Sequence, residues 1–158
     1  IPYFFYLDKY LAPFSRNPDE PSSSGLRLRL SSYGLLFSMV SMFGFFGIGY
    51  FSEDRSDILR TIGLPGLHGP FSYIVFGGLV ITGIFFGLLI LIYHSKIPRL
   101  LGLYMIVIPI IPGLNFVNNV DPSRPFWEWM ILFSIFIWII PVGVYLLLDA
   151  REKYKSGR

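Results

Sequence analysis

The chain has 158 residues, of which 53% are hydrophobic and 15% are charged, with 13 Lys and Arg residues, 10 Asp and Glu residues and no cysteine. Soluble domains average about 25% charged residues, so this composition argues against a water-soluble fold. The lack of cysteine excludes disulfides, thiolate metal sites and cysteine nucleophiles within this sequence. Nothing in it resembles a phosphate-binding glycine loop or a basic, aromatic-rich patch for nucleic acid.

Residues 1–25 form a distinct first segment that is too short and too charged to cross a membrane. Its aromatic residues are Tyr3, Phe4, Phe5, Tyr6, Tyr10 and Phe14. A linker rich in Pro and Ser follows at 17–25. Because aromatic side chains with polar tips favour the headgroup region, this segment is predicted to be an interfacial anchor or docking arm. A tail that is ordered by its neighbours is the alternative.

Four apolar runs follow, uncharged except for Glu128 near the start of the fourth, and we predict helical spans at about 31–51, 71–93, 100–118 and 126–148. Each is close to the roughly 20 residues that cross a hydrocarbon core of about 30 Å. The runs lack the alternation of a transmembrane β-barrel. Residues 26–158 are therefore predicted to form an all-α, four-helix transmembrane bundle. Between its first two spans, Ser52 is expected to cap a short interfacial helix that Gly63 ends.

The basic residues are distributed asymmetrically among the segments that connect these runs. Four crossings put the N-terminal segment, the second loop and the C-terminal tail on one side, with 10 basic residues. The opposite side holds Arg55, Arg60 and Arg124. The positive-inside rule then predicts that both termini face the cytoplasm, stroma or matrix.

Two histidines flank the second run and are the candidate pigment ligands. His68 and His94 lie at its opposite ends, roughly 35 Å apart at 1.5 Å per residue. They cannot clamp one haem within the chain, but either could ligate the magnesium of a chlorophyll-type pigment. A hydrogen-bonding or interfacial histidine is the more common alternative, and no other metal site is expected.

The third run contains Pro109 and Pro112, which remove backbone donors and predict a kink or break near its middle. Asn115 and Asn118 follow. Their amides and the freed carbonyls are one candidate for an ion or solute site. The alternative is that both asparagines satisfy backbone groups near the end of the helix.

Small residues recur at close spacing in the second run, at Gly78, Gly83 and Gly87. Such residues let helix backbones approach closely in lipid, so we expect these glycines at helix contacts. A lipid or pigment resting on the glycine face is the second interpretation.

None of the four apolar runs contains an ionisable residue at mid-depth, which argues against proton relays and intramembrane catalysis. The expected function is a non-catalytic accessory subunit of a larger membrane complex, bound to other integral membrane subunits and to lipid or pigment. A photosynthetic or respiratory assembly, organellar or bacterial, is expected. An organellar inner or thylakoid membrane is favoured if Ile1 is the N-terminus that loss of a transit peptide leaves, and the alternative is that the sequence is a fragment. The alternatives are a small transporter or channel at the broken third helix, and an enzyme or assembly factor that uses the loop acids Glu53, Asp54 and Asp57.

Overall fold

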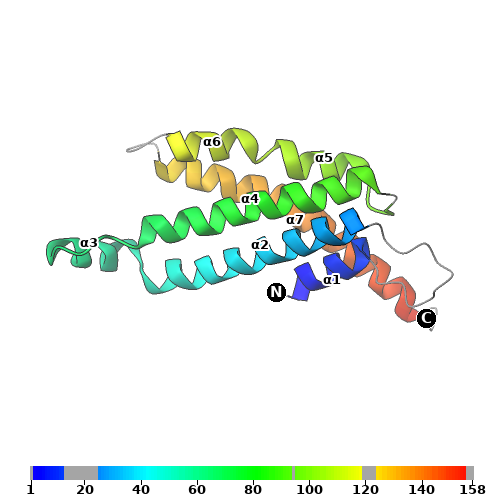
Figure 1. Ribbon diagram of the computed structural model, residues 1–158, viewed down its shortest axis with the longest axis horizontal. Coiled ribbons are helices and arrows are strands. Elements are labelled where there is room, and N and C mark those ends of the chain that lie inside the picture. The colour runs from blue at the N-terminus through cyan, green and yellow to red at the C-terminus, as the bar shows by residue number, and fades with distance from the viewer. Residues whose placement is uncertain (1, 13–24, 94, 119–123, 156–158) are drawn as a thin grey trace.

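The computed structural model describes residues 2–12, 25–93, 95–118 and 124–155, and this part of the chain contains helices and no strands (Figure 1). The helices are α1 (Pro2–Leu11), α2 (Gly25–Tyr50), α3 (Glu53–Thr61), α4 (His68–Ile92), α5 (Arg99–Val107), α6 (Ile110–Asn118) and α7 (Arg124–Lys155). Within the described residues, α2, α4, α5 with α6, and α7 are long and apolar enough to cross a membrane. The predicted all-α class is confirmed for the described residues, and so is the presence of four helices long and apolar enough to be spans.

Two of the long helices extend beyond the predicted apolar runs. α2 begins at Gly25, so that its first turns include Arg27 and Arg29, and α7 continues to Lys155. Backbone hydrogen bonding can continue past the last apolar residue, because a charged side chain on a helix end still reaches water. The apolar runs therefore mark the part of each helix that suits hydrocarbon, and they underestimate the helix lengths.

The buried face of α2 consists entirely of small residues, which are Ser31, Gly34, Ser38, Ser41, Gly44 and Gly47. Its most exposed large side chains include Phe43 and Phe46, at 65% and 74%. A β-carbon added at Gly44 would lie 2.8 Å from the Val75 side chain on α4. The small face thus allows the backbone of α2 to approach α4 closely.

α4 is the central helix and packs against α2 on one side and α5 on the other (Figure 1). Gly78 faces Ser41 on α2, while Gly83 and Gly87 face α5. A β-carbon added at Gly87 would lie 2.7 Å from the Gly102 carbonyl oxygen, and one added at Gly83 would lie 3.0 Å from that of Met105. All three glycines named from the sequence therefore lie at helix contacts.

The third long segment is broken between Val107, the last residue of α5, and Ile110, the first residue of α6. Pro109 has no N–H to donate to the Met105 carbonyl, which is the oxygen that faces Gly83. Pro112 lies in the first turn of α6, where a missing N–H is tolerated. Because of the break, the two halves of this segment pack on different helices. α5 packs mainly on α4, and α6 packs mainly on α7.

α1 packs against the bundle between α2 and α7 (Figure 1). Phe4, Leu7 and Leu11 are buried, and the Phe4 ring stacks on Phe86 of α4 with centroids 6.4 Å apart. The Arg27 side chain donates to the Leu11 carbonyl at 2.6 Å, at the C-terminal end of α1. These neighbours order the segment. Residues 13–24, which include all of the predicted linker except Gly25, lie outside the described residues.

α3 is the short helix predicted between the first two spans, and it projects beyond the ends of the long helices (Figure 1). Gly63 ends it with a φ of 79°, and the Leu64 N–H donates to the Leu59 carbonyl at 2.9 Å. This is the glycine-terminated pattern expected of a helix C-terminus. Ser52 occupies the N-cap position of α3, as predicted, but its side chain makes no capping hydrogen bond.

At the opposite end of the bundle, Asp149 is 6% exposed and pairs with two lysines. Lys153 lies 2.6 Å from one carboxylate oxygen, and Lys96, from the α4–α5 connection, lies 3.6 Å from the other. The pairing joins α7 to that connection and supplies the opposite charge that a buried carboxylate requires. We call this the basic end of the bundle, and the other the α3 end.

Candidate functional site

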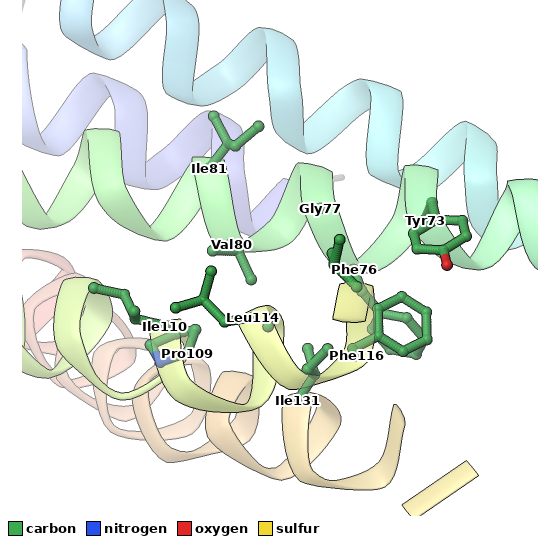
Figure 2. Close-up of a pocket in the computed structure, with 12 residues that line it drawn as sticks. Tyr73, Phe76, Gly77, Val80, Ile81, Pro109, Ile110, Leu114, Phe116 and Ile131 are labelled. Atoms are coloured by element: carbon green, nitrogen blue, oxygen red, sulfur yellow. The ribbon is translucent and has the colours of Figure 1, made fainter. Parts of the chain in front are cut away.

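A pocket of about 290 Å³ opens where α6 leaves α4 and turns toward α7 (Figure 2). We call it the α4–α6 pocket. Its walls include Tyr73, Gly77 and Val80 on α4, Gly113 and Phe116 on α6, and Ile131 on α7. The floor is buried, since Phe116 and Ile131 are 2% and 1% exposed. The mouth is open to the side, where Leu114 and Val117 of α6 are exposed.

Two glycines widen the pocket on its facing walls. A β-carbon added at Gly77 or at Gly113 would meet no neighbouring atom within 4 Å. These glycines therefore differ from Gly83 and Gly87, whose missing side chains permit helix contact. On α4, Gly83 and Gly87 pack against α5, whereas Gly77, roughly two to three turns away, borders open space.

The pocket is apolar along its length. Among the described lining residues, the Tyr73 hydroxyl is the sole side-chain polar group. The Tyr73 and Phe76 rings pack on Phe116 with centroid distances of 4.9 and 5.7 Å, which closes the pocket toward the α3 end (Figure 2). An apolar pocket of this kind binds hydrocarbon and offers little to an ion.

His68 lies at the α3 end of α4 and connects it to α3. Its ring Nδ1 lies 3.0 Å from the Phe51 carbonyl, and its Nε2 lies 3.4 Å from the Glu53 carboxylate. Its backbone N–H donates to the buried Ser56 hydroxyl at 3.0 Å. Because a carbonyl can only accept, Nδ1 carries a proton, and Nε2 would have to leave Glu53 to ligate a pigment magnesium. His94 lies outside the described residues.

The two asparagines are not brought to the α4–α6 pocket. Asn115 donates its amide to the Ile111 carbonyl of its own helix at 2.9 Å. Asn118 is exposed at the C-terminal end of α6. Both are described residues, and neither lines the pocket.

Apart from Ser31, which donates to the Asp8 carboxylate on α1, the buried hydroxyl groups described on the long helices donate within their own helices. Ser41, Thr82 and Ser134 donate to the carbonyls of Phe37, Gly78 and Ile131 at 2.6 to 2.8 Å. The described residues contain no cluster of three His, Asp or Glu side chains that could hold a metal ion. Bonded in this way, the hydroxyls have no donor left for a substrate.

We expect His68→Phe to loosen α3 while it keeps a ring of similar size in place. The variant removes the hydrogen bond to Phe51, which is worth about 0.5–1.5 kcal/mol, so amide exchange in α3 should be roughly 2- to 10-fold faster. Glu53→Gln is the milder comparison, since it keeps the Phe51 bond and Glu53 is largely exposed. Hydrogen–deuterium exchange measures both. Unchanged exchange in α3 of His68→Phe would show that His68 does not hold this helix.

Comparison of the chain with protein-family models, curated proteins and solved structures gave no match to any of them.

Proposed function

We propose that this chain is an integral membrane protein with four spans, α2, α4, α5–α6 and α7, and that it is a non-catalytic accessory subunit of a larger membrane complex. The partners would be other integral membrane subunits. An energy-converting assembly, photosynthetic or respiratory, is the proposed setting.

The outward face of α2 carries this proposal. Large side chains follow one another along it at Met39, Phe43, Phe46 and Tyr50, with exposures of 49%, 65%, 74% and 66%. In water such a row would be an extensive exposed apolar patch, whereas lipid or a neighbouring helix accommodates it. The spacing of four, three and four residues keeps the row on one side of α2, so it forms a ridge that can pack into a partner helix. We call it the α2 ridge.

The side chains in the interior of the bundle support a non-catalytic role. The four predicted runs contain no ionisable side chain at mid-depth, and their described buried hydroxyls donate within their own helices, apart from Ser31, which donates to Asp8 on α1. Charged groups at mid-depth usually mark proton and ion pathways, so this interior favours a supporting subunit. The local bonding of Asn115 and the apolar pocket give no support to the alternative of a solute channel.

Sidedness follows from the basic residues, which favour placing the basic end and both termini in the cytoplasm, stroma or matrix. Because the chain has no cysteine, single cysteines can be introduced at the exposed positions Lys9, Asp57 and Lys155. In sealed vesicles, an impermeant maleimide should label Lys9→Cys and Lys155→Cys from one side and Asp57→Cys from the other. Labelling of all three from the same side would contradict four crossings.

The subunit role is tested by solubilisation in a mild detergent, followed by native gel separation and mass-spectrometric identification of the partners. We expect the chain to migrate in a complex with other integral membrane subunits, which mass spectrometry identifies. Phe43→Ala with Phe46→Ala should reduce their recovery by about tenfold, the effect of losing about 1.4 kcal/mol. Phe133→Ala with Phe136→Ala, which removes two exposed rings from α7, is the matched control. Migration of the unaltered chain alone would overturn the proposal.

A further inference from the structure

We infer that the α4–α6 pocket holds one acyl chain of a membrane glycerolipid. The inference rests on the proposed membrane residence and assigns a binding site to this part of the bundle.

The position of the pocket determines what can reach it. Its mouth is a side opening between α4 and α6, framed by the exposed Leu114 and Val117, and lies along the apolar length of both helices. In a bilayer this opening faces hydrocarbon, where the surrounding molecules present acyl chains. A polar solute from either aqueous side would meet an apolar lining and the aromatic closure formed by Tyr73, Phe76 and Phe116.

The shape of the pocket fits a chain that lies parallel to the helices. Its lining extends from Tyr73 to Ile81 on α4 and from Pro109 to Val117 on the facing wall. Eight helical steps correspond to about 12 Å at 1.5 Å per residue. Gly77, labelled in Figure 2, and Gly113 lie midway along these two ranges, and a β-carbon added to either would meet open space, so the centre of the slot stays open.

The size and chemistry of the pocket favour a chain over a pigment ring. Its volume of about 290 Å³ is at the lower limit of the roughly 300–1,000 Å³ typical of small-molecule sites. No histidine or carboxylate is among its described lining residues, so it provides no side-chain ligand for magnesium. Flexible hydrocarbon, held by dispersion contacts, matches such a lining.

The position of the pocket is determined by how the helices pack and by the break at Pro109. Glycine contacts hold α5 on α4, the break at Pro109 redirects α6, and packing on α7 keeps α6 there. A chain held in the pocket should therefore exchange more slowly than lipid that touches the outward face of α2.

The experiment uses the full chain in phosphatidylcholine vesicles that contain a small fraction of phosphatidylcholine with a diazirine on one acyl chain. After irradiation, mass spectrometry locates the adducts. We expect adducts on the pocket residues Ile110, Leu114 and Val117 to exceed those on the α2 ridge. Gly77→Phe and Gly113→Leu should each reduce the pocket adducts by about tenfold, because an added side chain meets open space there and fills the slot. Gly49→Phe, also in open space but on α2, is the matched control and should leave them unchanged.

The outcomes separate this inference from the function on which it rests. If the α2 ridge is labelled as heavily as the pocket and neither filling variant changes the pattern, the chain resides in lipid but the pocket holds no acyl chain. If neither the ridge nor the pocket is labelled, membrane residence fails and the inference fails with it. Thermal unfolding of the two filling variants should match that of Gly49→Phe, which shows that lost labelling reflects a filled pocket and an intact fold.

Discussion

The contact between the backbones of Gly87 on α4 and Gly102 on α5 is the constraint on which the rest of the bundle depends. A β-carbon added at Gly87 would lie 2.7 Å from the Gly102 carbonyl oxygen, and one added at Gly102 would lie 2.9 Å from that of Gly87. Each glycine therefore fits because the other also lacks a side chain. The contact fixes α5 on α4, so the departure at Pro109 moves α6 alone, and the α4–α6 pocket forms where the two helices separate.

Small residues at the α2–α4 contact also explain why bulky side chains lie on the outward face of α2. The buried residues of α2 are all Gly and Ser, and its most exposed side chains, such as Phe43 and Phe46, are bulky. Van der Waals packing between closely approaching backbones drives helix association in lipid, where neighbouring tails are as apolar as the side chains. With small buried residues and bulky exposed ones, α2 can pack closely on α4 within the chain. It can also present the α2 ridge to a helix of another subunit. The proposed accessory role follows from this division.

Much of the fold could be predicted from the sequence, because it depends on local properties. Apolar run length identifies the four spans, and the fixed geometry of Pro109 indicates the break. The spacing of Phe4, Leu7 and Leu11, at three and four residues, carried a further signal that was missed: it is the pattern of a helix with one packed side. It indicates that the first segment packs on the bundle.

The candidate site was much less predictable, because it depends on contacts between distant residues. No local feature of the sequence shows that α5 packs on α4 while α6 packs on α7. The pocket forms only because these two halves of the third span pack on different helices. Gly77 and Gly113 resemble the packing glycines in sequence and differ from them in what faces them. His68 could not be assigned because its partner Phe51 lies 17 residues away, across α3. The asparagines proved to be bonded locally or exposed.

The most direct test of the account is the distance between α6 and α7 when the break is repaired. Spin labels on cysteines at Asn118 and Trp129, both exposed in this otherwise cysteine-free chain, report that distance by pulsed electron resonance. In Pro109→Ala with Pro112→Ala the third span regains its backbone donors, so it should continue along α4 and the two labels should move apart by several ångströms. An unchanged distance distribution would contradict the claim that the prolines turn α6 away from α4 and so create the pocket.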